Sequence, residues 1–386
     1  MAVASTFNGQ AFLPAALYHC PDVAEWEQLV YARRFWHPIA LVSELPQGAA
    51  LSRELLGVEL VLTHPPGIGP RAFLNQCPHR GVALLAPGTS IAACRKLICP
   101  YHGWTYAPDG RLLAAAREGE FCAPFERRDW DLSPIDLGVG GPFLWVRLPV
   151  QPTAANDGNS DSQDDAGPSL VDQLDLLREL GGWSVSEPGS PAASTPALPL
   201  WGRRRRTLAC NWKIAHDNTL DDYHVAIAHP TTLHRLQGPV SAYRHVFGRW
   251  CNLLATPVPG AGLPAGEFLT FSVPPWNHLL LWPDGTTALI GFHPEAIDRC
   301  RMELTLAGPS MESGENSARA EAQLNQMTAF LEEDRALVES AQRAYASPGF
   351  KIGPAHGLER RLLHHQALYR EVLGRSSLGQ AAAGAG

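Results

Sequence analysis

Two short segments of the chain each place one cysteine close to one histidine. The first reads CPHRG and contains Cys77 and His79, and the second reads CPYHGW and contains Cys99 and His102. Two thiolates and two imidazoles can hold a [2Fe–2S] cluster in which two cysteines bind one iron and two histidines bind the other. A neutral imidazole adds less negative charge than a thiolate, so such a cluster accepts an electron more easily. We therefore predict an electron-transfer centre at these four residues.

A structural zinc ion is the alternative, because it also takes two cysteines and two histidines. Zinc fingers usually place both cysteines in one loop and both histidines on a helix, whereas each segment here is mixed. A proline follows each cysteine and stiffens the loop, and a glycine lies just after each histidine, where it allows a tight turn. This arrangement favours a cluster of Rieske type over zinc.

A second pair of histidines, His224 and His229, lies in the segment NWKIAHDNTLDDYHVAIAHP at residues 211–230. Five residues along a regular helix rotate a side chain by about 140°, so the two imidazoles would not face the same way on one helix. Pro230 disfavours helical geometry at His229. We therefore expect His224 to lie on a helix over residues 214–228 and His229 to swing from its end, with a π-bulge as the alternative.

Non-haem Fe(II) oxygenases add one carboxylate to two histidines and leave other iron positions open. The expected source is a helix predicted over residues 317–346, whose apolar residues recur at helical spacing. Asp334 projects near the centre of this apolar stripe, Glu333 at its edge and Glu332 on the far side. A carboxylate on a buried face is costly unless it is paired or binds a metal. Asp334 is thus the expected third ligand, and a salt bridge to an arginine is the alternative.

Together these motifs resemble the Rieske non-haem iron oxygenases, specifically their large (alpha) catalytic subunit. The family pattern has N-W-K, an acid followed by Asn, then D-x-Y-H, four residues and H. Residues 211–229 match each element, with Asp217 where the acid is often Glu. The resemblance implies that His224 and His229 bind mononuclear Fe(II). It also implies a third ligand from a late acidic helix, which agrees with Asp334.

The resemblance further implies that Asp221 has a catalytic role as a bridge between two metal centres. In this family the Rieske domain of one subunit is thought to abut the iron site of its neighbour in a homotrimer. Asp221 would accept hydrogen bonds from His224 of its own chain and from His102 of a neighbouring subunit, and such carboxylates fix the imidazole tautomer. The alternatives are a helix-surface acid or a transfer of the role to Asp222.

The activity that the resemblance implies is incorporation of O₂ into a small organic substrate, by hydroxylation or oxidative demethylation. Arene cis-dihydroxylation is the alternative within the family. The sequence contains no glycine-rich dinucleotide motif and no ferredoxin-like set of cysteines, so electrons from NAD(P)H would come through a separate reductase or ferredoxin. A Rieske electron carrier without oxygenase activity is the alternative of a different class, and an intact second iron site argues against it.

The stretch from Asp217 to Asp221 is similar to that of choline and betaine-type monooxygenases, which would hold a quaternary ammonium among aromatic rings. Trp276, Trp282 and Tyr243 would supply such a cage, or they pack in the core. Further candidates for the substrate pocket are chosen by proximity to the ligands. They are Leu220, Val225, Leu233, Phe271 and Leu280.

The composition suits a globular enzyme. The chain has 386 residues, enough for two domains, and 45% of them are hydrophobic. The formal net charge of −7 argues against general binding of nucleic acid. The six cysteines outside the two clusters are scattered, which favours a reducing compartment, and we expect the cytoplasm. No membrane span is predicted, and the first 17 residues lack the features of a secretory signal.

These patterns predict an α+β protein with two domains. We expect a small all-β Rieske domain over residues 38–150. A catalytic domain of antiparallel sheet and helices, similar to the helix-grip fold, is expected over 170–377. Residues 1–37 would form a helical segment packed on the catalytic domain. The polar stretch 151–169 would be a flexible loop, and 378–386 a disordered tail.

Local signals place several strands and turns. In the Rieske domain, strands are expected at 58–63, 72–75 and 143–148, and a hairpin at the turn Pro108-Asp109-Gly110. In the catalytic domain, strands are expected at 271–273, 278–282 and 288–292.

Four consecutive arginines occupy residues 203–206. They could dock an acidic ferredoxin, or they could lie on an exposed strand edge with solvated charges. The second interpretation is the commoner one for charge runs.

Overall fold

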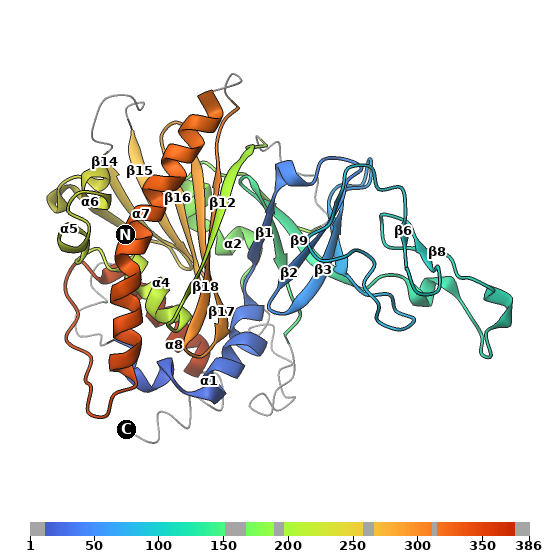
Figure 1. The fold of residues 1–386 in the computed structure, drawn as a ribbon, viewed down its shortest axis with the longest axis horizontal. Coiled ribbons are helices and arrows are strands. Elements are labelled where there is room, and N and C mark those ends of the chain that lie inside the picture. The colour runs from blue at the N-terminus through green and yellow to red at the C-terminus, as the bar shows by residue number, and fades with distance from the viewer. Residues whose placement is uncertain (1–11, 151–166, 189–196, 258–265, 311–314, 375–386) are drawn as a thin grey trace. The chain divides into compact units, whose positions relative to one another are not determined.

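A computed structural model of the chain describes residues 12–150, 167–188, 197–257, 266–310 and 315–374 (Figure 1). Most of the expected loop over 151–169 and all of the expected tail over 378–386 lie outside these residues. The chain divides into two compact units. The first unit comprises residues 1–35, 150–183 and 199–386, and the second comprises residues 36–149 and 184–198.

The second unit contains two antiparallel sheets. The larger sheet has the order β1-β10-β9-β4-β3-β2-β5, with β11 beside β9, and the smaller has the order β6-β7-β8. The strands of the larger sheet are β1 (His37–Leu41), β2 (Ala50–Leu55), β3 (Val58–Thr63), β4 (Arg71–Leu74), β5 (Ser90–Ile91), β9 (Pro134–Gly140), β10 (Phe143–Arg147) and β11 (Val185–Ser186). Those of the smaller are β6 (Leu97–Ile98), β7 (Thr105–Tyr106) and β8 (Leu112–Ala114).

Strand β3 shows how the larger sheet separates two cores. Leu60 and Leu62 pack into one buried cluster, whereas Val61 packs into a second cluster that contains Cys77 and Cys99. Successive side chains of a strand point to opposite faces, so the alternation follows from the backbone. The ligand loops therefore rest on a rigid sheet face. The strand predicted over 58–63 is confirmed.

The hairpin predicted around the Pro108-Asp109-Gly110 turn is also confirmed, between β7 and β8. Gly110 has a φ of +95°, and a Cβ atom at this position would lie 2.4 Å from the ring of Phe73. Only glycine satisfies both the backbone conformation and the close approach.

One segment departs from the expected domain boundaries. Residues 184–198 group with the β-rich unit and not with the expected catalytic domain over 170–377. The reason is strand pairing, because Val185 and Ser186 of β11 pair with Gly140 and Val139 of β9.

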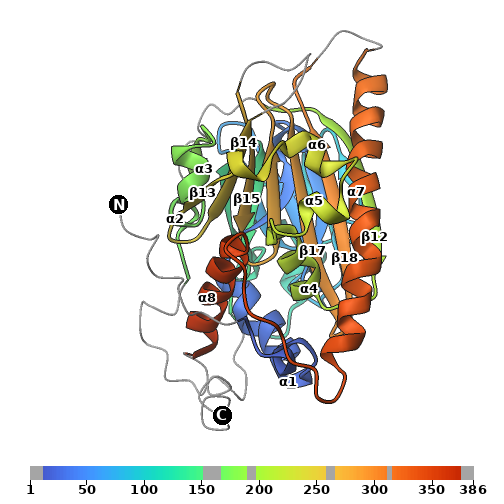
Figure 2. The same cartoon turned by 90° about the vertical axis from the view of Figure 1, so that its left-hand side faces the viewer.

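The first unit is built on a seven-stranded antiparallel sheet in the order β12-β18-β17-β16-β15-β14-β13. Helices α4, α5, α6 and α7 lie on one face of this sheet (Figure 2). The strands are β12 (Leu200–Leu208), β13 (Arg244–Phe247), β14 (Asn252–Pro257), β15 (Glu267–Val273), β16 (Asn277–Leu281), β17 (Thr287–Ala296) and β18 (Arg299–Ala307). The helices are α1 (Pro21–Trp26), α2 (Leu170–Gln173), α3 (Asp175–Glu179), α4 (Trp212–Leu220), α5 (Val225–Ala228), α6 (Leu233–Gln237), α7 (Glu315–Tyr345) and α8 (Arg360–Gly374).

This arrangement confirms an antiparallel sheet packed with helices. The strands predicted at 271–273, 278–282 and 288–292 correspond to β15, β16 and β17, and the helix predicted over 317–346 corresponds to α7. None of the described helices is long and apolar enough to cross a membrane.

A buried ion pair ties the N-terminal segment to α4. Glu27 follows α1 and is 2% exposed. It accepts hydrogen bonds from Lys213 Nζ at 2.5 Å and from Trp212 Nε1 at 2.7 Å. Buried charges need such partners, so the Trp-Lys pair of the sequence motif has a structural role here.

The four arginines of residues 203–206 lie on β12, the edge strand of the sheet. Arg204 pairs with Glu321 at 3.0 Å, Arg205 with Glu303 at 2.6 Å, and the Arg206 pair with Glu332 spans 3.3 Å. These pairs favour the strand-edge interpretation over the docking of a ferredoxin.

Candidate metal centres and substrate pocket

The two cysteine–histidine loops share one backbone pattern. The carbonyl of Cys77 accepts from the N–H of Gly81, and the carbonyl of Cys99 accepts from Gly103 four residues later in the same way. Each cysteine N–H donates to a carbonyl five residues ahead. Gly81 and Gly103 have φ values of +74° and +71°, which other residues rarely adopt. This pattern explains the glycine four residues after each cysteine.

The side chains of these loops converge. Nδ1 of His79 lies 3.0 Å from Nδ1 of His102, a separation that suits two nitrogens bound to one metal. Cys77 and Cys99 are both buried and belong to the same core cluster. The indole of Trp104 stacks on His79 with ring centres 4.9 Å apart. Two buried sulfurs and two facing nitrogens fit the ligand set of a Rieske [2Fe–2S] cluster.

The segment that carries the second histidine pair is not the single helix expected over 214–228. Helix α4 ends at Leu220, and His224 and His229 flank the one-turn helix α5. Oδ1 of Asp221 accepts the backbone N–H of Tyr223 at 2.8 Å. Such a side-chain turn competes with helical hydrogen bonding, which explains the break.

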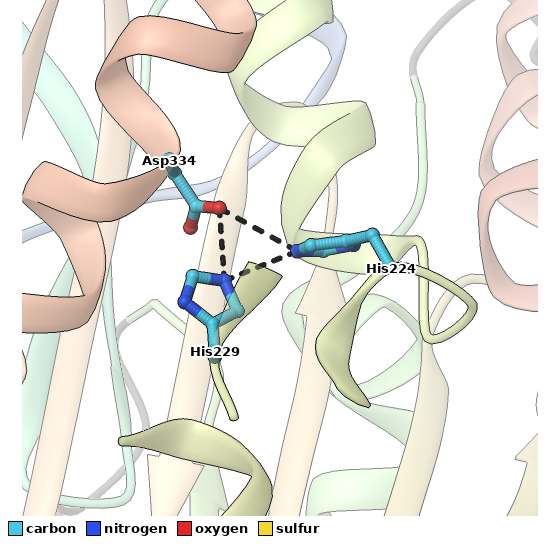
Figure 3. Close-up of side chains that lie close together, drawn as sticks. All are labelled: His224, His229 and Asp334. Atoms are coloured by element: carbon cyan, nitrogen blue, oxygen red, sulfur yellow. Dashed lines mark hydrogen bonds and ion pairs between the residues drawn. The ribbon is translucent and has the colours of Figure 1, made fainter. Parts of the chain in front are cut away.

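His224, His229 and Asp334 meet at one point (Figure 3). The Nε2 atoms of the two histidines are 3.2 Å apart. Oδ1 of Asp334 lies 2.9 Å from Nε2 of His229 and 3.5 Å from Nε2 of His224. Asp334 comes from α7, so the break after α4 is what brings both imidazoles to the same side of the carboxylate.

A carboxylate also faces the outer nitrogen of each imidazole. Nδ1 of His229 lies 2.6 Å from Oε2 of Glu333, and Nδ1 of His224 lies 3.5 Å from Oδ2 of Asp221. A carboxylate accepts hydrogen bonds, so Nδ1 of His229 carries the proton and its Nε2 presents a lone pair. The charge of Asp221 favours the same tautomer of His224, although Nδ1 of that ring makes no hydrogen bond within the part of the chain that the structure describes. Two lone pairs and the oxygen of Asp334 then face one another, and this set needs a cation. The residues therefore fit a mononuclear iron site of two histidines and one carboxylate.

The charges around His224 also favour a cation at this site. Burial by itself lowers the pKa of His224, but Asp221 and Asp334 outweigh burial and raise it to about 10. A proton would thus occupy the place of the metal in its absence, because the surrounding carboxylates stabilise positive charge.

Asp222, the alternative for the bridging role, is engaged elsewhere. It is 2% exposed, and its Oδ1 lies 3.2 Å from Nη1 of Arg361 in a buried ion pair. Its Oδ2 lies 2.9 Å from Nε2 of His245. Asp221 is instead partly exposed and lies beside His224.

Comparison with known proteins covers both units. Residues 35–123 match the Rieske [2Fe-2S] domain, and residues 183–249 and 263–375 match the catalytic domain of the ring hydroxylating alpha subunit. The chain belongs to the family of Rieske ring-hydroxylating alpha subunits. In this family the first domain carries a [2Fe–2S] cluster and the catalytic domain binds mononuclear iron.

Several relatives of this alpha subunit act on different substrates. The carnitine monooxygenase oxygenase subunit of Escherichia coli is 31% identical, over 62% of this chain and 57% of that protein. The glycine betaine monooxygenase oxygenase subunit of Chromohalobacter salexigens is 29% identical, over 59% of this chain and 45% of that protein. The anthranilate 1,2-dioxygenase large subunit of Acinetobacter baylyi is 29% identical, over 56% of this chain and 43% of that protein. The match spans about half the length of these relatives.

Solved structures show the same fold as this alpha subunit. The quaternary ammonium Rieske monooxygenase CntA has a TM-score of 0.72 at 22% identity, covering 94% of this chain and 95% of that one. Naphthalene 1,2-dioxygenase from Rhodococcus has a TM-score of 0.69 at 18% identity, covering 95% and 96%.

A pocket of the alpha subunit opens beside the three metal-ligating candidates. Of the five predicted lining residues, Val225, Leu233 and Leu280 line it, whereas Leu220 and Phe271 do not. Thr270 lines the pocket, so its neighbour Phe271 points to the opposite face of β15. The prediction failed there because it rested on sequence proximity and ignored the strand face.

The pocket is lined by both apolar and polar residues. The lining residues that sequence reasoning missed are Asn218, Thr219, Gln237, Thr270, His278, Ile290, Phe330, Leu331 and Arg361. Arg361 is held by Asp222, so the ion pair is neutral as a whole. Burial holds the pKa of His278 well below its usual range, so this imidazole is neutral. Strand alternation in β16 could have revealed His278, which lies two residues before Leu280.

The aromatic cage considered for a quaternary ammonium does not assemble at this pocket. Trp276 packs against Trp212 with ring centres 5.3 Å apart, and Trp282 packs against Phe268 at 4.8 Å. The hydroxyl of Tyr243 donates to Oε1 of Gln237 at 2.9 Å. Trp276 is therefore a core residue, whereas Trp282 is a partly buried residue packed on Phe268.

Proposed function

We propose that this chain is the catalytic subunit of a Rieske oxygenase. It would use O₂, and electrons from a separate NAD(P)H-dependent reductase or ferredoxin, to hydroxylate or oxidatively demethylate a small organic substrate. The observation that carries the proposal is the convergence of His224, His229 and Asp334 beside a lined pocket. A Rieske electron carrier would need no such site.

His224, His229 and Asp334 are the proposed ligands of the mononuclear iron. Iron held in this way would bind and reduce O₂ with electrons that arrive one at a time from the cluster. Cys77, Cys99, His79 and His102 are the proposed ligands of that cluster.

Asp221 is the proposed link between the two kinds of site. Its carboxylate orients the ring of His224, and its partial exposure leaves it accessible to a second donor. Following the family resemblance, we propose that His102 of a neighbouring subunit is that donor, in a homotrimer. The proposed compartment is the cytoplasm, which the scattered single cysteines favour.

The pocket residues would hold the substrate and exclude water. Leu280, Ile290 and Phe330 are apolar lining residues, and His278, which pairs with Ile290 across β16 and β17, adds a neutral polar group among them. This lining suits a small, largely apolar molecule. Arene dihydroxylation remains the second candidate, because the same apolar residues would accept a flat ring.

The test is NADH-dependent O₂ uptake with a Rieske reductase, using carnitine, glycine betaine, anthranilate and naphthalene as probes. Product formation coupled to O₂ uptake should vanish in His224→Ala, while the visible spectrum of the cluster survives. His19→Ala, which changes an exposed histidine, is the matched control. Unchanged coupled turnover in His224→Ala would contradict the proposed iron site, and turnover with none of the probes, together with about two irons per chain, would favour the electron carrier.

A further inference from the structure

Glu333 lies next to Asp334 on α7 but contacts the other side of the same histidine ring. The ring of His229 spans both carboxylates, with Nε2 2.9 Å from Asp334 and Nδ1 2.6 Å from Glu333. We propose that Glu333 is a positioning residue of the iron site, which fixes the tautomer and orientation of His229. This inference rests on the proposed function, since it assumes that His229 binds the metal.

A second contact makes Glu333 a link between two elements. The hydroxyl of Thr232 donates to the same Oε2 atom at 2.7 Å. Thr232 immediately precedes α6 and His229 immediately follows α5, so one carboxylate oxygen holds the turn between these helices against α7. The position of His229 is thus set by the same stretch of α7 that supplies Asp334.

The chemical effect follows from the imidazole itself. A neutral imidazole has one N–H, and the acceptor that receives it decides which nitrogen keeps a lone pair. Glu333 receives the proton of Nδ1, so Nε2 of His229 is left free to bind a metal, and the carboxylate also makes that nitrogen more basic. The corresponding contact between His224 and Asp221 is longer, at 3.5 Å. Of the two imidazoles, His229 is therefore the more firmly oriented.

The partial exposure of Glu333 allows an effect on metal binding to be distinguished from an effect on folding. Its side chain is 35% exposed, whereas His229 is fully buried. Because Glu333 is partly exposed, water can take its place at Nδ1 of His229, so loss of Glu333 should leave the fold intact and act on the metal. Glu332 is a natural comparison, because it is adjacent and pairs with Arg206 on the other side of the helix.

The experiment measures metal binding and does not need a substrate. The full chain with its cluster assembled is freed of mononuclear metal and titrated anaerobically with Co²⁺ against a competing chelator. In Glu333→Ala the affinity should fall about 10-fold to 100-fold, with a changed Co²⁺ absorption spectrum. Thr232→Val, which removes the link but keeps the contact to His229, should lose less affinity, and Glu332→Ala should match the wild type.

Two results would overturn the positioning role. One is an affinity in Glu333→Ala within about twofold of the wild type, since removal of an orienting carboxylate typically costs 10-fold or more. The other is an equal loss in Thr232→Val, which would assign the effect to the turn and not to the imidazole. A wrong assignment of the iron site would give a different result. The wild type would then bind Co²⁺ no better than His229→Ala.

Discussion

The hydroxyl oxygen of Tyr106 lies 3.3 Å from the sulfur of Cys77, and both residues are buried. Tyr106 belongs to β7, whose position is fixed by pairing with β6 and β8. A rigid strand therefore aims a hydrogen-bond donor at one of the proposed cluster ligands. Hydrogen bonds to cluster sulfurs are among the features that set the reduction potential.

Tyr106→Phe should lower the reduction potential of the cluster. The hydrogen bond stabilises the reduced, more negative cluster, and a contribution of about 1 kcal/mol corresponds to about 40 mV for a one-electron couple. A redox titration followed by visible absorbance measures the change. Tyr101→Phe, which changes an exposed ring beside His102, is the control. An unchanged potential in Tyr106→Phe would mean that the hydroxyl does not influence the cluster.

Asp334→Ala should remove the mononuclear iron and leave the cluster in place. The iron content should fall from about three to about two atoms per chain, because two histidines alone hold Fe(II) weakly. Iron analysis and the visible spectrum of the same sample report both sites. Asp298→Ala, at an exposed position, should keep the wild-type content. Retention of the third iron in Asp334→Ala would refute its assignment as a ligand.

Asp222→Ala should destabilise the catalytic unit by about 3–5 kcal/mol. The substitution leaves the guanidinium of Arg361, which is 1% exposed, without its ion-pair partner, and an uncompensated buried charge is costly. Denaturant unfolding of the wild type and the variant gives the difference in free energy of unfolding. A difference below about 1 kcal/mol would show that Asn252 and Thr270, the other contacts of Arg361, suffice.

Asp217 should make the stability of the protein depend on pH. Burial raises the pKa of Asp217 from 3.8 to about 7, although its hydrogen bonds with Tyr18 and Gln366 act in the opposite direction. The native state then keeps a proton that the unfolded chain loses above pH 4. The free energy of unfolding therefore falls as pH rises from about 4 to about 7, by less than about 4 kcal/mol because a cavity partly exposes the carboxylate.

Asp217→Asn should remove this contribution. The melting temperature of the wild type should drop more between pH 5 and pH 8 than that of the variant, because the amide does not titrate. An equal drop in both proteins would show that Asp217 titrates normally in the folded state.

The sequence predicted the metal sites better than their surroundings, for physical reasons. Cys77 and His79 lie within one short loop, so their spacing alone carries the chemistry. The break after Leu220 depends on a side-chain turn at Asp221, which periodicity does not report. The contact of Glu333 with His229 joins residues 104 positions apart. Such a contact depends on how α7 packs against the α5–α6 turn, and helical projection of α7 cannot reveal it.

The same limit applies to the fold. The strands β15, β16 and β17 were found because each is a short, largely apolar run and the turn Pro283-Asp284-Gly285 separates the last two. The placement of β11 was missed because its partner, β9, lies more than forty residues earlier in the chain, with Val185 paired to Gly140. Pairing between distant strands is decided by the packed sheet and not by the composition of a two-residue strand.

Helix α5 has only four residues, and the two proposed iron ligands stand at its two ends. A helix this short does not hold its shape alone in water. Binding of iron should therefore add to the contacts of Glu333 in ordering this turn. Val225 belongs to the turn and also lines the pocket, so a substrate packed on it would slow the escape of iron to a chelator. We therefore expect the rate of iron release to be lowest while substrate is bound.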